Sequence, residues 1–444
     1  MTPVGRLFAL ALAVGTLCGV VALPAGAASP ITPANRPTPL PNAVNGEVPP
    51  SRLVNVIPNC IAAREAAPSL MRIFTMARQA QVALGAEECY RRLADQVQYA
   101  NDANQPGANP ACVASVGTSP GGKPVGHSMH GWGKAVDLTD WGASLTFNSG
   151  GYAFMKQVAG SLGWNHPAFA EPGGSSCPEP WHWEWVGDGG TLGGTPVRGD
   201  AVALLPSADD RGYATVTGLG AVAPHGTFVN RGSAANVQLH WVMVGATTTR
   251  NRDGYWMVAA DGGVFSFGKA GFHGSTGAMR LNSPINGMAS TRSGKGYWLV
   301  AWDGGIFTFG DARFHGSTGA MHLNRPVVGM APTPSGKGYW LVASDGGIFT
   351  FGDARFRGST GALRLVSPIV GMAPTPSGKG YWLVASDGGV FTFGDARFYG
   401  SLGGQALPAP VIGLVPTKTG KGYWLELADA SVAARGDARH FGNG

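Results

Sequence analysis

The sequence is poor in charge, because Asp, Glu, Lys and Arg make up only 13% of its 444 residues, against a usual share of about 25%. With 44% apolar residues, this composition excludes a charged disordered protein, a coiled coil and a long helical bundle. No run of like charges accompanies the net charge of +6, so a nucleic-acid-binding protein is not supported. Glycine is abundant, with 70 residues, but it does not recur at every third position, which excludes collagen. Low charge with this much glycine indicates turn-rich β structure.

Cysteine is scarce, with five residues, and no two of them have Cys-x-x-Cys spacing. A zinc site made of thiolates is therefore not supported. Cys18 lies inside an N-terminal apolar run, and four cysteines remain: Cys60, Cys89, Cys112 and Cys177. An even number in an exported chain predicts two disulfides. Proximity along the chain favours Cys60–Cys89 and Cys112–Cys177, and the other pairings stay open.

The N-terminus has the pattern of a secretory signal over residues 1–27. Arg6 precedes the apolar run Leu7 to Leu23, and Ala25-Gly26-Ala27 is a small-x-small cleavage site, so we expect cleavage after Ala27 and a secreted, extracellular or wall-associated protein. The apolar run is at the short limit for a membrane span, which leaves an uncleaved anchor as the alternative. Residues 28–50 are rich in proline and have no hydrophobic period, so they predict an extended tether.

Residues 51–190 are predicted to form a compact α+β domain. Apolar residues recur every three or four positions from Pro68 to Leu84, and Gly85 follows as a stop, which predicts an amphipathic helix. Two more helical stretches are expected, from about Arg92 and over Tyr152 to Leu162. The β-compatible segments are Ala135 to Leu138 and Trp181 to Val186.

Residues 192–444 consist of a repeat with a period of 42. Gly-Tyr-Trp recurs with its tyrosine at Tyr255, Tyr297, Tyr339, Tyr381 and Tyr423, and a degenerate copy surrounds Tyr213, which makes six units. Four strands are expected in each unit, and in the unit around Tyr339 they are Pro326 to Pro332, Tyr339 to Ala343, Gly347 to Phe351 and Ala354 to Ser359. Asp345-Gly346 is a strong hairpin signal between the middle two. Four strands at this period are typical of a propeller blade. We therefore expect an all-β six-bladed β-propeller, with a β-solenoid or an open array of hairpins as the alternative.

The residues that can carry chemistry lie in two segments, Ser128-Met129-His130-Gly131-Trp132-Gly133-Lys134-Ala135-Val136-Asp137 and Glu179-Pro180-Trp181-His182. A catalytic zinc needs three nitrogen or oxygen ligands from the protein and one open position for water. His130, Asp137 and His182 meet that requirement. Glu179, three residues before His182, can take a proton from water and return it to a leaving amine.

The two segments resemble the zinc D-alanyl-D-alanine carboxypeptidases of the VanY type, whose pattern is Ser-x-His-x-x-Gly-x-Ala-x-Asp followed by Glu-x-Trp-His. A third family segment, Tyr-Arg-x-x-x-x-Gln, is met by Tyr90-Arg91 and Gln96, and the resemblance covers about residues 55–188. It implies that His130, Asp137 and His182 bind Zn²⁺ and that Glu179 is the general base and acid. It also implies that Arg91 faces the developing oxyanion, and that Ser128 and Gln96 bind the substrate or support the residues that do.

Several alternatives stay open at the sequence level. Arg92 competes with Arg91, although the spacing to Gln96 favours Arg91. Glu184 is an alternative base, but strand alternation places it on the same face as His182, which favours a supporting role. His127 is expected to be peripheral, because a fourth protein ligand would close the site to water. The tryptophans around the motifs, Trp132, Trp164, Trp183 and Trp185, either line a substrate groove or pack in the core.

The favoured function is a secreted zinc peptidase that removes the terminal D-alanine from stem peptides of peptidoglycan. An endopeptidase of the same family is the first alternative, because the motifs fix the chemistry and not the length of peptide accepted. The second alternative is a non-catalytic protein that binds the cell wall through its propeller. Peptidoglycan stem peptides are the expected partners, with a wall polymer or a protein as a possible partner of the repeats. No nucleic acid and no stable membrane span after signal cleavage are expected.

Overall fold

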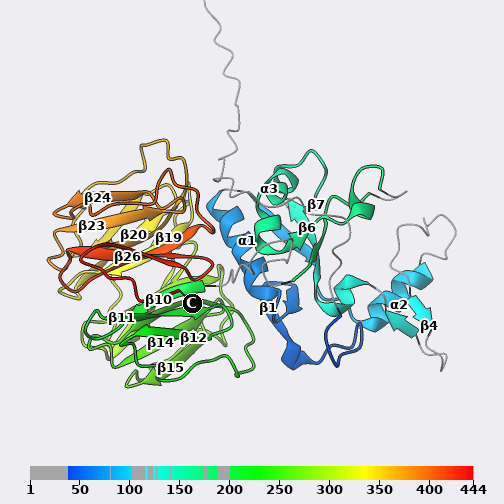
Figure 1. The fold of residues 1–444 in the computed structure, drawn as a ribbon, viewed down its shortest axis with the longest axis horizontal. Helices are drawn as coiled ribbons and strands as arrows, with labels where there is room; N and C mark the ends of the chain where they lie inside the picture. The colour runs from blue at the N-terminus through cyan, green and yellow to red at the C-terminus, as the bar shows by residue number, and fades with distance from the viewer. Residues whose placement is uncertain are drawn as a thin grey trace, which may run out of the picture.

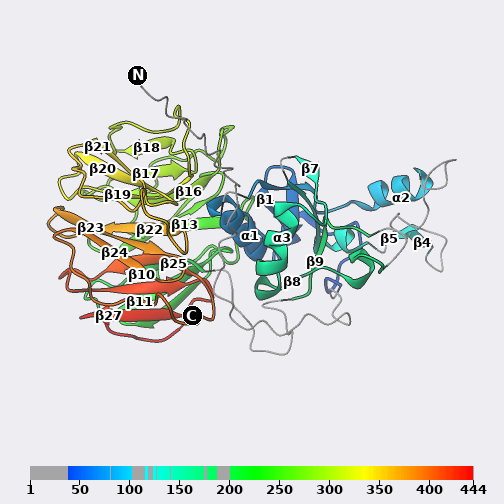
Figure 2. The same cartoon turned by 90° about the horizontal axis from the view of Figure 1, so that it is seen from above.

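A computed structural model describes residues 39–80, 82–102, 116–118, 124–126, 128–140, 142–174, 178–187 and 201–443. It has two parts, an α+β domain up to residue 187 and a ring of β-sheets from residue 201, which lie side by side (Figures 1 and 2). The predicted signal peptide and the predicted Cys112–Cys177 disulfide lie outside the described residues. Among the described residues, the helices are all too short or too polar to cross a membrane.

The α+β domain is built on the antiparallel sheet β3-β6-β9-β8, with the short strand β7 paired to β6. Its helices are α1 (Ala67–Gln79), α2 (Leu93–Asp102) and α3 (Gly150–Val158), with 3-10 turns η1 (Pro50–Arg52), η3 (Met129–Trp132), η4 (Gly160–Leu162) and η5 (Ala168–Ala170). Its strands are β1 (Leu53–Ile57), β2 (Cys60–Ala63), β3 (Leu84–Glu88), β4 (Val116–Thr118), β5 (Pro124–Gly126), β6 (Ala135–Asp140), β7 (Ala143–Ser144), β8 (Trp164–Asn165) and β9 (His182–Trp185). The predicted fold class is confirmed.

Helix α1 is shorter than the apolar period predicts. It ends at Gln79, and Leu84, the last residue of the predicted helix, is instead the first residue of β3 and pairs with Asp140 of β6. The backbone N–H and C=O groups of residues 84–88 form hydrogen bonds in the sheet. Strand pairing therefore overrides the helical period, which Leu84 extends only by chance. The difference matters for the site, because β3 leads directly into Cys89 and Arg91.

The predicted tether is too long at its C-terminal end. Leu40 and Val48 are 2% and 5% exposed and belong to the core cluster of the α+β domain. The side chain of Asn45 donates a hydrogen bond to the carbonyl of Ser128 at 2.8 Å. The chain therefore joins the domain from about residue 39, because two apolar side chains and one buried amide hold it there.

The disulfide Cys60–Cys89 forms as predicted and closes a sequence separation of 29 residues. Both cysteines are buried, at 0% and 2% exposure. The bond ties β2 to the end of β3, directly before the segment that carries Arg91.

The repeats form six antiparallel sheets of three strands. They are β10 (Ala201–Pro206), β11 (Gly212–Thr217), β12 (Val222–Gly226); β13 (Met243–Thr248), β14 (Gly254–Ala259), β15 (Val264–Gly268); β16 (Ile285–Ser290), β17 (Gly296–Ala301), β18 (Ile306–Gly310); β19 (Val327–Pro332), β20 (Gly338–Ala343), β21 (Ile348–Gly352); β22 (Ile369–Pro374), β23 (Gly380–Ala385), β24 (Val390–Gly394); and β25 (Val411–Pro416), β26 (Gly422–Leu427), β27 (Val432–Gly436). The first strand of each sheet contacts the first strand of the next, and β10 contacts β25. The six sheets therefore close into a ring, the six-bladed propeller predicted from the period.

Each blade has three strands and not the predicted four. The segment Ala354–Ser359 does not form a strand. Its backbone groups bond side chains instead of a neighbouring strand: the carbonyl of Arg355 accepts from Trp340 Nε1 at 2.9 Å, and the carbonyl of Gly358 accepts from the Tyr381 hydroxyl at 2.6 Å. These repeated aromatic side chains satisfy the segment, which is why the Gly-Tyr-Trp motif recurs in the core.

The junction between the last and the first blade repeats the same contacts. The Tyr213 hydroxyl donates to the carbonyl of Gly442 at 2.6 Å and accepts from the amide of Phe441 at 3.1 Å. Inside the ring, Tyr297 makes the equivalent bonds to Gly274 and His273 at 2.6 and 3.1 Å. The C-terminal segment thus closes the propeller through the degenerate first repeat.

Candidate metal centre

Three elements bring the predicted ligands together. Asp137 on β6 and His182 on β9 are direct partners in the antiparallel sheet. His130 lies in the 3-10 turn η3, where the Ser128 hydroxyl caps the turn by accepting from the amide of His130 at 3.2 Å. Gly133 ends this turn with φ +67°, a left-handed conformation that glycine adopts without strain and that turns the chain into β6. A sheet pair and a capped turn therefore position the three side chains.

The three candidate ligand atoms converge on one point. His130 Nε2 lies 3.1 Å from Asp137 Oδ1 and 3.2 Å from His182 Nδ1, and His182 Nδ1 lies 2.9 Å from Asp137 Oδ1. Ligands of one tetrahedral zinc, with bonds of about 2.0–2.1 Å, are separated by roughly 3.3 Å. All three side chains are at most 15% exposed. The spacing of the atoms fits a single metal ion.

The outer nitrogens of the two histidine rings are already engaged. His130 Nδ1 lies 2.7 Å from the carbonyl oxygen of Cys89, and His182 Nε2 lies 3.3 Å from Glu184 Oε1. Each outer nitrogen then donates its proton, and the inner nitrogen of each neutral ring presents a lone pair toward Asp137. Two lone pairs and a carboxylate directed at one point can hold a cation between them, either a proton or a metal ion, which makes these residues a candidate metal centre.

The titration behaviour of the site agrees with this electrostatic requirement. Burial alone lowers the pKa of His182, but hydrogen bonds and charge interactions with Asp137 and Glu184 outweigh it and raise the pKa to about 10. Burial alone raises the pKa of Asp137, and the two histidines pull it well below its usual range. Both shifts favour a proton on His182 at the point where the ligand atoms meet, and a metal ion bound there takes the place of that proton.

Glu179 lies beside the ligands without joining them. Its Oε2 atom is 3.9 Å from His182 Nδ1, and its side chain is 21% exposed. Burial raises the pKa of Glu179, and the nearby His182 partly opposes the shift. A carboxylate at the edge of a metal site with a raised pKa is suited to moving a proton. Glu184 occupies the buried side of His182 and supports that ring, as the strand alternation predicts.

The backbone of Glu179 is held on both sides. Its amide donates to the carbonyl of Ala170 at 3.0 Å, and its carbonyl lies 3.0 Å from His166 Nε2. His166 Nδ1 lies 3.1 Å from Glu171 Oε1, and the ring is 4.8 Å from that of Trp183. His166 and Glu171 form a support for Glu179 that sequence reasoning missed, because neither belongs to the motif segments.

Arg91 points into the site and Arg92 points away from it. Arg91 Nη2 lies 3.8 Å from Asp137 Oδ2, whereas Arg92 is exposed and pairs with Asp95. Glu88 orients the Arg91 guanidinium by accepting hydrogen bonds at both carboxylate oxygens, one from Nε at 2.6 Å. Tyr99 lies against the same guanidinium, with its ring centroid 4.8 Å from Cζ. These contacts favour Arg91, in agreement with the spacing to Gln96, and add Glu88 and Tyr99 to the site.

Gln96 is buried beneath the turn that carries His130, a position that suits the supporting role among the two that the resemblance implies. It is 0% exposed, its Nε2 donates to Asn45 Oδ1 at 3.0 Å, and its Oε1 accepts from the amide of Ser128 at 3.4 Å. A Cβ atom at Gly131 would lie 2.0 Å from Asn45 Oδ1, so glycine is required where the N-terminal segment crosses the turn that carries His130. Gln96 and Asn45 thus hold the turn that carries His130, and Ser128 caps it.

The aromatic residues near the motifs divide into core and surface. Trp164, Trp183 and Trp185 are 0–4% exposed, so they pack in the core and do not line a groove. Phe169, which sequence reasoning missed, is 39% exposed with its ring centroid 5.5 Å from that of His182. It provides an accessible apolar wall beside the candidate ligands. His127 lies outside the described residues.

Comparisons with known proteins agree with this geometry. Residues 61–188 match the family model of VanY, D-alanyl-D-alanine carboxypeptidase, and this range contains every predicted site residue. No curated protein matches the sequence of the chain. Among solved structures, the β-propeller domain of Myceliophteria thermophila Cps50 (Swd1) is similar, at 9% sequence identity and a TM-score of 0.38, over 53% of this chain and 82% of that chain. The assignment of the propeller rests on the closed ring of sheets described above.

Proposed function

We propose that the protein is a zinc-dependent peptidase that hydrolyses the terminal D-alanyl-D-alanine bond of peptidoglycan stem peptides. The observation that carries the proposal is the convergence of His130 Nε2, Asp137 Oδ1 and His182 Nδ1, with Glu179 and Arg91 beside them. The match of residues 61–188 to the carboxypeptidase family supports the reaction class and the substrate class. Two histidines and one carboxylate are a donor set that catalytic zinc sites use.

The chain's own residues divide the chemistry between them. His130, Asp137 and His182 would hold a zinc ion, which would polarise a peptide carbonyl as a Lewis acid and lower the pKa of a bound water. Glu179 accepts the proton of the attacking water and delivers it to the leaving amine, a role that its position at the rim of the ligand set allows. Arg91, kept in place by Glu88, directs its remaining N–H groups toward the oxygen on which negative charge develops.

Export of the protein is part of the proposal. The Cys60–Cys89 disulfide is of the kind that persists in oxidising compartments, and the N-terminal sequence has the pattern of a secretory signal. Peptidoglycan lies outside the membrane, so an exported peptidase meets this substrate. These features together support a secreted or wall-associated location.

The test is to incubate the zinc-loaded protein with a muropeptide that ends in D-alanyl-D-alanine and to follow the products by mass. Loss of one alanine residue is the expected result, and cleavage of a cross-linked dimer with an intact pentapeptide would assign endopeptidase activity instead. His130→Ala is expected to abolish the reaction, and His322→Ala, an exposed histidine on the propeller, serves as the matched control and keeps full activity. No product from either substrate would refute the proposal and favour a wall-binding protein without catalysis.

A further inference from the structure

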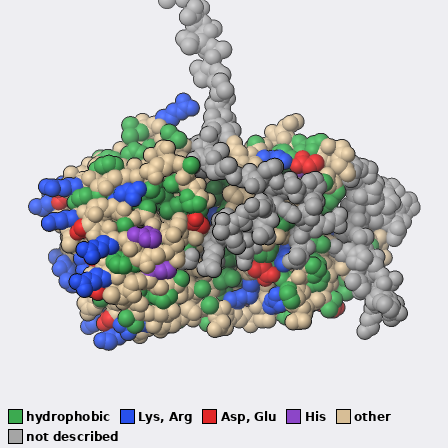
Figure 3. Space-filling model, viewed as in Figure 1, with side chains coloured by type: hydrophobic (Ala, Val, Ile, Leu, Met, Phe, Trp, Pro, Cys, Tyr) green, Lys and Arg blue, Asp and Glu red, His purple; other side chains and the backbone are tan. Residues whose placement is uncertain are grey.

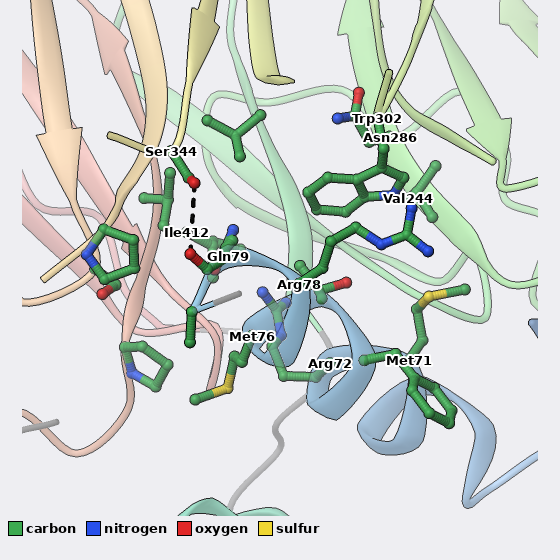
Figure 4. Close-up of a pocket in the computed structure, with 18 of the residues that line it drawn as sticks. Met71, Arg72, Met76, Arg78, Gln79, Val244, Asn286, Trp302, Ser344 and Ile412 are labelled. Carbon is green, nitrogen blue, oxygen red and sulfur yellow. Dashed lines mark hydrogen bonds between the residues drawn. The ribbon is translucent and has the colours of Figure 1, made fainter. Parts of the chain in front are cut away.

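One face of the propeller is already occupied by the chain itself. Arg78 of α1 lies over the ring of Trp302, with Cζ 5.4 Å from the ring centroid, and the carbonyl of Gln79 accepts from the Ser344 hydroxyl at 3.4 Å (Figure 4). Arg72 of the same helix donates to the carbonyl of Ala201. A cavity of about 1210 Å³ remains between α1 and the first strands of the blades, away from the candidate metal centre. Helix α1 therefore covers this end of the ring and leaves the opposite end for a partner.

The chain path defines that opposite end. In the third repeat, Ile285 at the start of β16 and Trp302 after β17 both line the cavity under α1, so the turn over residues 291–295 and the segment that follows Gly310 lie at the other end of the sheet. The two adjoin, because the carbonyl of Lys295 accepts from the amide of Asp311 at 3.1 Å. The same pairing recurs in the fourth to sixth repeats.

This end carries an exposed lysine in the turn and an exposed arginine after the third strand in each of the last four repeats. The pairs are Lys295 and Arg313, Lys337 and Arg355, Lys379 and Arg397, and Lys421 and Arg439, and we call them the distal rim. In Figure 3 Lys and Arg side chains gather along the side of the propeller that faces away from the α+β domain. The rim therefore presents a band of positive charge.

The carboxylates nearby do not neutralise the distal rim. One aspartate accompanies each pair, and in the fourth repeat Asp353 accepts from the hydroxyl of Thr333 at 2.8 Å and from that of Ser335 at 2.5 Å. Within the described residues, no rim cation lies within 4.0 Å of a carboxylate oxygen. Each of these repeats has two cations and one carboxylate, which already accepts hydrogen bonds from hydroxyl groups. The rim therefore has an excess of positive charge that can bind an external anion.

Exposed phenylalanines alternate with these cations. Phe314, Phe356 and Phe398 directly follow the rim arginines, and Phe272 holds the same position in the second repeat. All four are 59–61% exposed, which is unusual for an apolar ring that recurs at a fixed place. An apolar ring beside a guanidinium offers one surface to the carbon skeleton of a sugar or polyol and another to a phosphate.

We propose that the distal rim binds a linear phosphodiester-linked wall glycopolymer. Arginine favours phosphate because its planar donors match phosphate oxygens in pairs. Such a polymer repeats one sugar or polyol and one phosphate, and the rim repeats one phenylalanine ring and two cations. Several units of the polymer can therefore bind several repeats at once, which makes the overall affinity much higher than that of a single site. The cell wall as the source of this polymer rests on the proposed function, but binding at the rim does not depend on catalysis.

The test measures binding of the full chain to immobilised poly(glycerol phosphate) teichoic acid. The double variant Arg355→Ser/Arg397→Ser is expected to weaken binding at least tenfold, with a smaller salt dependence. Arg280→Ser/Arg364→Ser is the matched control. These exposed arginines share one repeat position in the loop after the rim segment, and Arg364 lines the cavity under α1, at the opposite end of the ring from the distal rim. This control removes the same charge and should stay within twofold of wild type. The variant Phe356→Ser/Phe398→Ser keeps the charge and should weaken binding severalfold.

Three outcomes would overturn the proposal: no binding by wild type, equal losses in the arginine variant and its control, or equal binding to poly-γ-glutamate, which has the charge without phosphate. Stronger binding to phosphatidylglycerol vesicles with the same arginine dependence would assign the rim to membranes and also overturn it. The release of alanine by each variant from a soluble muropeptide is measured in parallel. Lost binding with unchanged alanine release separates the rim from the metal centre, and failure of the peptidase assay leaves the binding result readable.

Discussion

The disulfide Cys60–Cys89 links the stability of the α+β domain to the metal centre. It closes a loop of 29 residues, and the chain-entropy model gives a stabilisation of about 3.6 kcal/mol for a loop of that length. The carbonyl of Cys89 also accepts from His130 Nδ1 at 2.7 Å, so the bond holds the acceptor that orients one candidate ligand. We predict two separate losses in Cys60→Ala/Cys89→Ala.

The first loss is thermal. About 3.6 kcal/mol corresponds to a fall of roughly 10 °C in the unfolding temperature of a domain of this size, measured by calorimetry. The second is metal affinity, which should fall about 10- to 100-fold in a zinc competition titration, because the histidine loses a fixed partner. Cys112→Ala/Cys177→Ala removes the other predicted pair and leaves the Cys60–Cys89 bond intact, so it is the control for the second loss and should keep the zinc affinity of wild type. An unfolding temperature within 2 °C of wild type together with unchanged zinc affinity would refute the reasoning.

Three further perturbations test other parts of the structure. His166→Phe keeps the ring packing but removes the hydrogen bond to the carbonyl of Glu179. The kcat should fall roughly 10- to 100-fold, while KM and zinc content stay unchanged. An unchanged kcat would show that His166 does not support Glu179. Tyr213→Phe and the matched Tyr297→Phe should each cost about 1–3 kcal/mol in urea unfolding, whereas an open array would tolerate the change at Tyr213. Burial raises the pKa of Glu426 well above its usual value, with a smaller opposing effect of Arg72. The free energy of unfolding should therefore fall as the pH rises from about 4.3, the pKa of glutamate in the unfolded chain, through the higher pKa in the folded protein. Glu426→Gln should remove that fall. Parallel profiles of unfolding free energy against pH for wild type and variant would contradict this prediction.

Features set by local pattern could be predicted from the sequence. The 42-residue period gave six blades because a stacked repeat must preserve its turn glycines and core aromatics in register. The candidate ligands His130, Asp137 and His182 could be named because a metal site needs particular donor atoms at particular places along a strand and a turn. In both cases the chemistry restricts residue type and spacing within a short segment.

Features set by long-range packing could not be predicted. Asn45 bonds Gln96, which lies 51 residues further along the chain. No pattern in the sequence predicts that the C-terminal part of the expected tether packs into the domain. The end of α1 depended on pairing between Leu84 and Asp140. The absence of the fourth strand depended on aromatic side chains of the same blade and of the next one. The spacing to Gln96 favoured Arg91 over Arg92, but the reason lies in their contacts: Glu88 orients Arg91 toward the site, and Asp95 pairs with Arg92 at the surface.

The central claim is that Glu179 moves the proton in a reaction at the three-ligand centre. The measurement that tests it most directly is the rate of D-alanine release by zinc-loaded Glu179→Gln, compared with wild type at equal zinc content. The variant keeps the size of the side chain and lies outside the ligand set, so its zinc content should be unchanged while the rate falls at least ~10²-fold. An unchanged rate at equal zinc content would contradict the account.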